Sequence, residues 1–174
     1  VGIILFIFGH DKHLVSVLDG GLKKWLIENR KTTNKKTILN KSTYRAIENK
    51  SLVKNIFEIN ENIKKKKFTI IDARSRERFN GSVPDPRKNV RSGSIPNSVC
   101  LPFKEIVNSS DNTFKGVSEI SKKFSEIIDL NDDKRVFSCG SGITACVLGL
   151  AYSLVNNTYS PTVYDGSWAE YGRI

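Results

Sequence analysis

The sequence predicts an α/β domain in which a central parallel sheet carries helices on both of its faces. Short apolar runs alternate along the chain with segments whose apolar residues recur at helical spacing, and such alternation is typical of parallel sheets. The run at 68–72 reads FTIID and ends in a carboxylate, which indicates a strand buried on both faces. At 174 residues, 39% of them hydrophobic, the chain is long enough to bury one core of this kind.

The individual elements of this domain are expected from residue 43 onward. Helices are predicted at 44–66, with a break near 49–51, and at 74–79, 117–130 and 143–155. Strands are predicted at 68–72, 98–101, 135–138 and 162–164. The segment 81–96 contains three prolines and two glycines and is predicted to be a long loop. Ligands of parallel sheets bind at the carboxyl ends of the strands, so the functional site is expected there.

The first 42 residues are expected to lie outside this domain. LVSVLDGGLKKWL (14–26) and SPTVYDGSWAEYG (160–172) both run from an apolar strand into Asp-Gly and then a helix start that bears a tryptophan. We interpret residues 1–30 as the C-terminal remnant of a first copy, so that the chain begins inside a folded unit. Residues 31–42 are polar and basic, as expected of a linker, and an edge strand is possible from residue 37.

Composition excludes several classes of partner. The net charge of +10 is compatible with nucleic-acid binding, but the lysine runs carry no interleaved aromatic residues to stack bases, so no nucleic-acid partner is expected. The apolar start VGIILFIF is too short to span a bilayer, so no membrane partner is expected. Three cysteines without paired spacing favour a reducing, cytoplasmic location, with a mitochondrial one left open. With two histidines and no CxxC, we expect no metal and no cofactor.

The sequence FSCGSGITAC places a cysteine directly behind a predicted strand. Gly140 and Gly142 permit the loop to curl so that successive N–H groups point inward, and the following helix aims its N-terminal donors at the same point. A cysteine sulfur held there is favoured as the thiolate, which is the nucleophilic form. Ser141 and Thr144 can add hydroxyl donors. The pattern therefore predicts that Cys139 is a nucleophile.

Two other interpretations of cysteine apply to this chain. A lone cysteine is often structural, and we keep that interpretation for Cys100, inside a predicted strand, and for Cys146, on the apolar stripe of a predicted helix. Tyrosine phosphatases also carry a cysteine loop at a strand end, but their loop ends in an arginine that grips phosphate. Here the sixth residue after Cys139 is Ala145, so phosphoryl transfer would lack its main charge partner.

Four motifs, namely CGSGITAC, DGSW, FTIIDAR and the ERF…PDPR…SGSIPNSVCLPF segment, together resemble the rhodanese superfamily. The chain looks most like the two-domain 3-mercaptopyruvate sulfurtransferases, and its FGH…VSVLDGG…W stretch is similar to the end of their inactive N-terminal domain. The resemblance implies a rhodanese-like fold. It also implies that residues 1–30 are the remnant of a non-catalytic rhodanese domain and that residues 43–174 are the catalytic one.

The resemblance implies sulfur transfer. The keto-acid thiol 3-mercaptopyruvate would donate sulfur to Cys139, which becomes a persulfide, and a thiol, a thioredoxin or cyanide would accept it. Ser141 matches the family's proton-relay serine. The neutral loop resembles that of mercaptopyruvate enzymes, whereas thiosulfate-preferring members carry basic residues there. The loop residues implied in binding substrate and persulfide are Gly140, Gly142, Ile143 and Thr144.

Two arginines, Arg78 in ERF and Arg87 in PDPR, match the residues with which the family binds the substrate carboxylate. A monoanionic keto acid needs planar cationic partners, and a guanidinium group supplies two-point contacts. Asp72 and Arg74 match the family's Asp-x-Arg motif and are expected to buttress the strand end.

The chain also departs from the family pattern. Where relatives often read Gly-His-Ile-Pro-Gly, residues 93–97 read GSIPN and lack the imidazole. The family's Asp and His that assist Ser141 are expected upstream of Val1. A thiosulfate sulfurtransferase and a non-catalytic module that binds partners or senses oxidants stay open as alternatives. Residues 1–30 carry large apolar side chains for a domain core that is mostly absent here, so we expect self-association through them.

Overall fold

Five parallel strands form one sheet in the computed structural model, which describes residues 2–132, 134–156 and 160–174. Within these residues the strand order is β1-β5-β4-β2-β3. The strands are β1 (Val53–Lys54), β2 (Thr69–Asp72), β3 (Val99–Cys100), β4 (Arg135–Ser138) and β5 (Val163–Tyr164). β2 and β4 pair along their whole length, so that Asp72 lies opposite Ser138 at the carboxyl edge. The predicted parallel sheet is confirmed.

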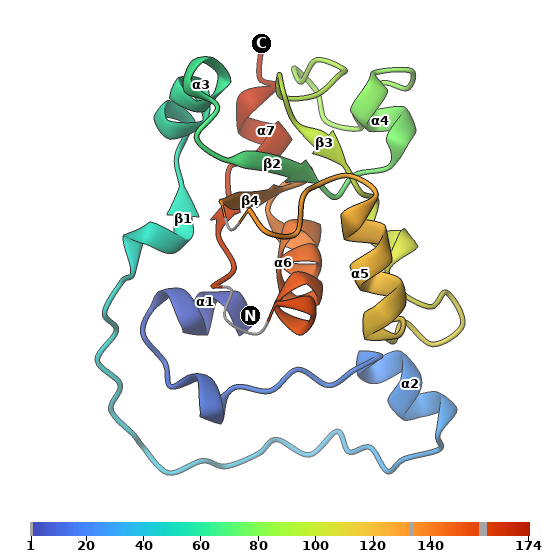
Figure 1. Ribbon diagram of the computed structural model, residues 1–174. Coiled ribbons are helices and arrows are strands. Elements are labelled where there is room, and N and C mark those ends of the chain that lie inside the picture. Colours follow the sequence, from blue (N-terminus) through green and yellow to red (C-terminus); the bar gives the residue numbers. More distant parts are fainter. Residues whose placement is uncertain (1, 133, 157–159) are drawn as a thin grey trace.

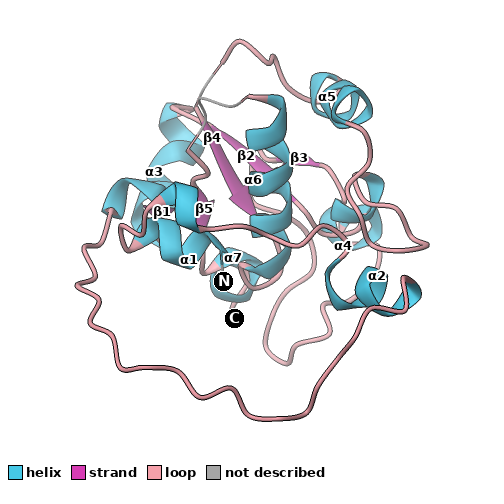
Figure 2. Ribbon diagram, turned by 90° about the horizontal axis from the view of Figure 1, so that it is seen from below, coloured by secondary structure: helices cyan, strands magenta, loops and turns pink. Residues whose placement is uncertain are grey.

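Helices cover both faces of this sheet, as predicted (Figures 1 and 2). One face carries α3 (Ile56–Lys65) and α7 (Ser167–Tyr171), and the other carries α5 (Val117–Ser125) and α6 (Ile143–Val155). Neighbouring strand residues alternate between the two faces. Ile70 and Val136 pack in the core under α3 and α7, whereas Ile71 and Phe137 pack in the core under α5 and α6.

A capping box fixes the start of α3. The Asn55 side chain accepts hydrogen bonds from the N–H groups of Phe57 and Glu58, and the Glu58 carboxylate accepts one from the Asn55 N–H, all at 3.0 Å. The helix predicted at 44–66, with a break near 49–51, is therefore wrong in the part before the break. Residues 43–49 form no regular element, and the 3₁₀ helix η2 (Lys50–Leu52) and β1 precede α3.

The remaining elements lie close to their predicted positions. β4 and α6 begin and end where the sequence places them, and α4 (Arg76–Asn80) follows β2 as expected. The helix predicted at 117–130 ends at Ser125, because Ile127 and Ile128 pack against the core from a turn instead. Residues 81–96 form the predicted long loop. A further 3₁₀ helix, η3 (Phe103–Glu105), follows β3.

The N-terminal segment consists of α1 (Gly2–Ile7), the 3₁₀ helix η1 (Lys12–Leu14) and α2 (Gly21–Ile27). The strand predicted before Asp19 is not formed, because residues 15–18 have no strand partner among the described residues. Ile7 is buried, and Ile3 packs against the core under α6. The backbone of residues 47–49 also donates hydrogen bonds to the carbonyl groups of residues 7–8. This part of the segment thus packs against residues 47–49 and the core under α6 of the same chain.

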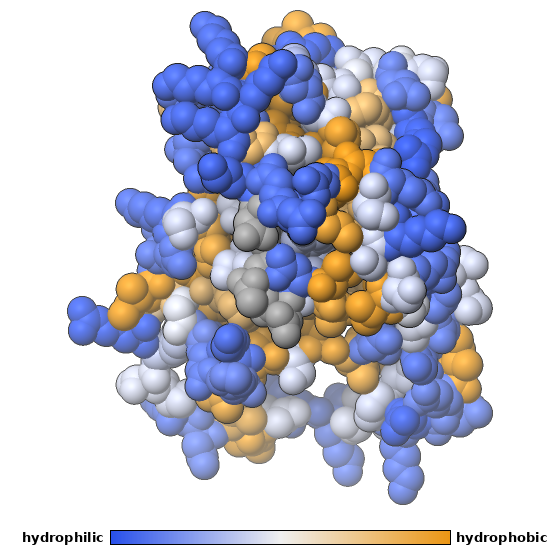
Figure 3. Space-filling view, in the orientation of Figure 1, coloured by the Kyte–Doolittle hydropathy of each residue, from blue (hydrophilic) through white to orange (hydrophobic). Residues whose placement is uncertain are grey.

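Residues 31–42 are exposed and form no regular element, and Figure 1 shows them as a long excursion from the body of the molecule. The edge strand considered from residue 37 is not formed: Ile38 is 95% exposed, and β1 occupies that edge of the sheet. Figure 3 shows the lower part of the molecule, where this segment runs, as hollowed. Every helix within the described ranges falls short of the length and apolar character needed to cross a bilayer.

Candidate active site

The loop at residues 139–142 joins the carboxyl end of β4 to the first turn of α6. Cys139 opens this loop and is 1% exposed. Because β4 lies between β5 and β2, the cysteine sits near the middle of the edge at which parallel sheets bind their ligands. The first N–H groups of α6 have no acceptor within the helix and point toward the same loop, where they favour negative charge.

Backbone donors at the start of α7 hold the carbonyl groups of this loop. The N–H of Trp168 donates to the carbonyl of Cys139 at 3.0 Å, and the N–H of Ala169 donates to the carbonyl of Gly140 at 2.9 Å. In a trans peptide the N–H points away from the carbonyl of the same unit, so the N–H groups of Gly140 and Ser141 face away from α7. Successive N–H groups on one side of a loop are the arrangement of an anion nest.

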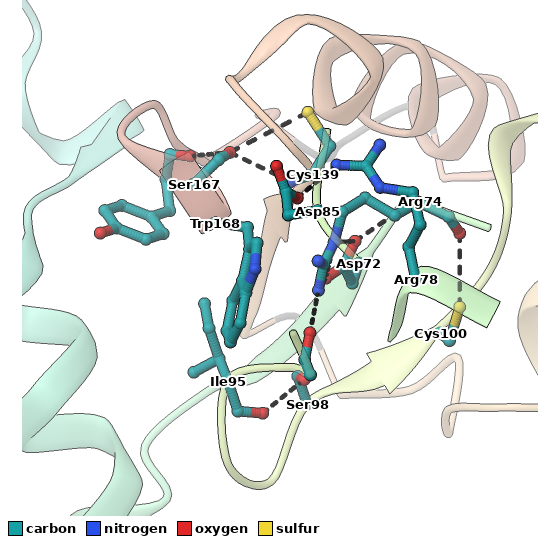
Figure 4. A network of polar contacts seen from close by, with 12 residues as sticks. Asp72, Arg74, Arg78, Asp85, Ile95, Ser98, Cys100, Cys139, Ser167 and Trp168 are labelled. Carbon is teal, nitrogen blue, oxygen red and sulfur yellow. Dashed lines mark hydrogen bonds and ion pairs between the residues drawn. The ribbon is translucent and has the colours of Figure 1, made fainter. Parts of the chain in front are cut away.

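Ser167 fixes the two ends of the loop from inside the protein. Its Oγ accepts hydrogen bonds from the N–H groups of Cys139 at 3.0 Å and Gly142 at 3.1 Å, and its hydroxyl donates to the carbonyl of Tyr164 at 2.8 Å. The same Oγ lies 4.0 Å from Cys139 Sγ (Figure 4). Ser167 is fully buried and has a φ of 50°, a conformation that costs a non-glycine residue energy.

Ser167 is not among the predicted site residues, although it lies in the DGSW motif. The available signal was a serine directly after Asp-Gly at the carboxyl end of a predicted strand, where a tight turn places side chains near the site. That signal does not reveal the partners of the hydroxyl, because they lie 25 and 28 residues away in sequence.

Arg78 and Arg87, the two predicted substrate arginines, come together beside Gly140. A Cβ built on Gly140 would lie 3.1 Å from Arg87 Nη2 and 3.4 Å from Arg78 Nη2. The absence of a side chain at this position lets both guanidinium groups approach the backbone that follows the cysteine. Arg78 comes from α4, and Arg87 comes from the long loop after it. Figure 4 draws Arg78 in one cluster with Cys139, Asp85 and Ser167.

Asp85 joins the two arginines, and sequence reasoning did not identify it. Its Oδ2 lies 2.7 Å from Arg78 Nη2, and its Oδ1 lies 3.1 Å from Arg87 Nη1. The Asp85 side chain is 2% exposed. Burial raises the pKa of this carboxyl, but the hydrogen bonds from Arg78 and Arg87 outweigh that effect, so its pKa lies below the ordinary value. Asp85 is therefore an ionised carboxylate at neutral pH.

The other predicted loop residues differ in their exposure. Two features of position 142 require glycine: its φ of 82° is unfavourable for other residues, and a Cβ there would lie only 2.6 Å from Asp165 Oδ1. Ser141 is exposed, and Ile143, also predicted, is 74% exposed at the start of α6. Thr144, the last of the set, is half-buried.

Trp168 forms a platform beneath the long loop. The guanidinium groups of Arg74 and Arg91 stack on its ring at 4.6 and 5.6 Å from the centroid, and its Nε1 donates to the carbonyl of Arg91 at 2.8 Å. Arg74 also forms a buried ion pair with Asp72 at 2.8 Å and donates to the carbonyl of Gly93 at the same distance. The Asp-x-Arg pair thus buttresses the end of β2 and holds the loop that carries Arg87.

The two remaining cysteines have environments that disfavour the thiolate. Burial raises the pKa of Cys100 to about 11, and its Sγ lies 3.5 Å from the carbonyl of Arg74. Burial also raises the pKa of Cys146, whose Sγ lies 3.2 Å from the carbonyl of Gly142. Within the described part of the chain, no three His, Cys, Asp or Glu side chains gather in a way that could hold a metal ion.

Comparison with known proteins places this loop in a defined family. The model of the rhodanese-like domain matches residues 57–173. The 3-mercaptopyruvate sulfurtransferase of Homo sapiens is 37% identical over 165 residues, which cover 94% of this chain and 54% of the human protein. The thiosulfate sulfurtransferase of Rattus norvegicus is 34% identical over 169 residues, which cover 96% of this chain and 55% of the rat protein. The chain thus spans about half the length of the curated relatives it matches.

Solved structures agree on the fold. The structure of SseA from Escherichia coli, described in terms of the rhodanese fold and the mechanism of 3-mercaptopyruvate sulfotransferases, matches with a TM-score of 0.78 at 29% identity. That match covers 96% of this chain and 60% of the bacterial one. The architecture described above is therefore the rhodanese fold, as the sequence motifs implied.

Proposed function

Since the chain belongs to the rhodanese-like domain family, we propose that it is a sulfurtransferase that moves a sulfane sulfur from 3-mercaptopyruvate through a persulfide on Cys139. The observation that carries this proposal is the meeting of a cysteine, a loop of backbone donors and two guanidinium groups beside Gly140 at one strand end. The names of the human and rat relatives support the reaction class.

The first step of the proposed reaction forms the persulfide. The Cys139 thiolate attacks the thiol sulfur of 3-mercaptopyruvate, an S–S bond forms, and the C–S bond breaks. The carbon fragment keeps the electron pair of the broken bond as the enolate of pyruvate, which takes up a proton to become pyruvate. Sulfur moves as the neutral atom, so that no external oxidant or reductant is needed.

The second step returns the enzyme to its starting state. An acceptor thiolate, from a small thiol or a thioredoxin, attacks the outer sulfur of the persulfide and releases the Cys139 thiolate. Cyanide can accept the same sulfur atom to give thiocyanate. Backbone N–H groups of the loop and the start of α6 stabilise the negative charge on sulfur in both steps.

The side chains near Cys139 receive distinct roles in this proposal. Arg78 and Arg87 bind the carboxylate of the keto acid, since a guanidinium pair offers planar two-point contacts to such a group. Ser141, which is exposed on the loop, relays the proton to the departing carbon. Gly140, Gly142, Ile143 and Thr144 line the position of substrate and persulfide.

The proposal is tested by comparing sulfur donors. We expect a higher kcat/KM with 3-mercaptopyruvate than with thiosulfate, with pyruvate and acceptor-bound sulfur formed in equal amounts. A Cys139→Ser variant should form neither product. Equal or better turnover of thiosulfate would favour the second candidate, a thiosulfate sulfurtransferase. The name of the rat relative supports this candidate. A folded protein that turns over neither donor would favour a non-catalytic binding or redox-sensing module.

Partners and location complete the proposal. We infer a cytoplasmic protein with a small-molecule sulfur donor and a thiol acceptor, although one relative from Arabidopsis thaliana is named as mitochondrial. Self-association through residues 1–30 is supported by their exposed side chains: Val17, Leu18, Leu22 and Leu26 are each more than half exposed. The division into a remnant at 1–30, a linker at 31–42 and a catalytic domain at 43–174 remains part of the proposal.

A further inference from the structure

The carboxylate of Asp85 uses both of its oxygens to bridge the guanidinium groups of Arg78 and Arg87. Oδ2 pairs with Arg78 at 2.7 Å, while Oδ1 pairs with Arg87 Nη1 and accepts the backbone N–H of Arg87, both at 3.1 Å. The Asp85 side chain is 2% exposed, whereas those of Arg78 and Arg87 are 27% and 35% exposed. The carboxylate therefore lies behind the arginines, and the two cations remain accessible.

Asp85 leaves guanidinium donors free for a ligand. Each guanidinium group carries five N–H donors. Asp85 accepts from Nη2 of Arg78 and Nη1 of Arg87, so the other terminal nitrogen of each arginine makes no hydrogen bond to this carboxylate. Nη atoms of both arginines lie within 3.4 Å of the Cβ position of Gly140, next to Cys139. The bridge fixes the two planar groups in place through Arg78 Nη2 and Arg87 Nη1, and it leaves Arg87 Nη2, 3.1 Å from the Cβ position of Gly140, without a bond to Asp85.

The bridge also sets the charge of the site. Two arginines and one carboxylate leave a single net positive charge beside Gly140. Asp165 lies at the other end of the loop, beside Gly142, and contributes a second carboxylate there rather than a cation. 3-Mercaptopyruvate carries one carboxylate charge, whereas thiosulfate is a dianion. A site with one net positive charge matches the first, and a site with two would favour the second.

We propose that Asp85 is a specificity-determining residue that holds the arginine pair in place and reduces its net charge to one, so that the site prefers monoanionic over dianionic sulfur donors. This inference rests on the proposed function for its substrate class. It concerns a residue that acts through Arg78 and Arg87 and does not itself touch the substrate. Loss of Asp85 should therefore change the ratio of kcat/KM for thiosulfate to kcat/KM for 3-mercaptopyruvate, and not only the overall activity.

The test replaces Asp85 with asparagine, which keeps the shape and removes the charge. We expect the ratio of kcat/KM for thiosulfate to kcat/KM for 3-mercaptopyruvate to rise by about tenfold or more, as a unit charge a few ångströms away implies. Asp85→Glu keeps the charge and should leave the ratio within about twofold of the original. Glu61→Gln is the matched control, since Glu61 also pairs with two cations, Lys65 and Lys67, but lies on α3.

A binding measurement separates this inference from the proposed function. In a Cys139→Ser background, calorimetry compares the affinities for pyruvate, a monoanion, and thiosulfate, a dianion. We expect Asp85→Asn to shift their ratio toward thiosulfate even if the unsubstituted chain transfers no sulfur. If Asp85→Asn weakens the binding of pyruvate and thiosulfate by the same factor, the inference is overturned. It is also overturned if Asp85→Glu shifts the ratio of the two affinities as much as Asp85→Asn does. If Asp85→Asn does not fold, Arg78→Gln can be used instead, because it removes a positive charge where Asp85→Asn removes a negative one. The ratio of the affinity for thiosulfate to the affinity for pyruvate should then fall. An unchanged ratio in that variant overturns the inference too.

Discussion

The hydroxyl oxygen of Ser167 lies 3.0 Å from the backbone nitrogen of Cys139, although 28 residues separate the two in sequence. The same oxygen accepts the N–H of Gly142 at 3.1 Å, so one side chain ties both ends of the nucleophile loop. The start of α7 binds the carbonyl groups of that loop as well. The turn after β5 thus shapes the loop after β4 and decides in which direction its N–H groups point.

Replacing Ser167 should therefore impair the nucleophile without touching it. Ser167→Ala leaves two buried N–H groups without their acceptor, at a cost of about 1–3 kcal/mol each. We expect a lower melting temperature and a kcat/KM reduced by at least about tenfold. Ser167→Gly also loses the oxygen but relieves the positive φ, so it should be more stable than Ser167→Ala by roughly 1 kcal/mol and equally impaired in catalysis.

A direct readout of the loop is the rate at which iodoacetamide alkylates Cys139. If Ser167 holds the loop in its reactive shape, this rate should be lower in both Ser167 variants than in the original chain. Unchanged alkylation together with a lower melting temperature would mean that Ser167 stabilises only the fold.

Cys139 alone should carry the transferred sulfur. Burial raises the pKa of Cys100 to about 11 and raises that of Cys146, so both are thiols at pH 8 and poor nucleophiles. After incubation with 3-mercaptopyruvate, intact mass and peptide mapping should find one added sulfur, on Cys139. An added sulfur on Cys100 or Cys146 with Cys139 unmodified would contradict the assignment. Cys100→Ser is a control that should keep the modification.

The substrate arginines should each contribute strongly to catalysis. Arg78→Ala or Arg87→Ala removes a partly desolvated partner of the substrate carboxylate, and we expect a loss of about 2–4 kcal/mol in transition-state binding, measured from kcat/KM. Arg87→Lys should recover little of it, because a lysine cannot make the planar two-point contact. Arg173→Ala, at an exposed position near the chain end, is the control. Full activity in Arg87→Ala would remove this residue from the site.

The elements around the site were predictable because their signals are local, such as an apolar strand followed by a glycine loop. The same loop composition predicts Cys139 as the nucleophile, and the resemblance of two short motifs implies Arg78 and Arg87; these roles stay predictions. Ser167 and Asp85 were not predicted as site residues, because their roles depend on partners that only the folded chain brings near. The helix expected at 44–49 failed for the same reason: those residues pair with residues 7–8, and periodicity does not report such contacts.

A side chain at Gly140 should impair substrate binding without impairing folding. Its φ is not in the left-handed region, so Ala is compatible with the backbone. The added methyl would lie 3.1 Å from Arg87 Nη2, however, so the Arg87 guanidinium group must shift slightly, whereas its 3.4 Å distance to Arg78 Nη2 is an ordinary contact. For Gly140→Ala we expect a melting temperature within a few degrees of the original and a KM for 3-mercaptopyruvate raised by about tenfold. A large loss of stability with an unchanged KM would contradict this account.

The N-terminal segment should cause self-association through α2. Leu22 and Leu26 lie one helical turn apart and are 65% and 54% exposed, whereas Ile7 in α1 is buried. Apolar side chains left in water cost about 25 cal/mol per Å² and promote association. The full chain should therefore scatter light as a dimer or larger species at micromolar concentration. The double variant Leu22→Glu and Leu26→Glu should scatter as a monomer. Phe57→Glu, which replaces an 80% exposed residue in the first turn of α3, should leave the association unchanged. A monomeric original chain would exclude self-association, and a double variant that stays oligomeric would place the interface elsewhere.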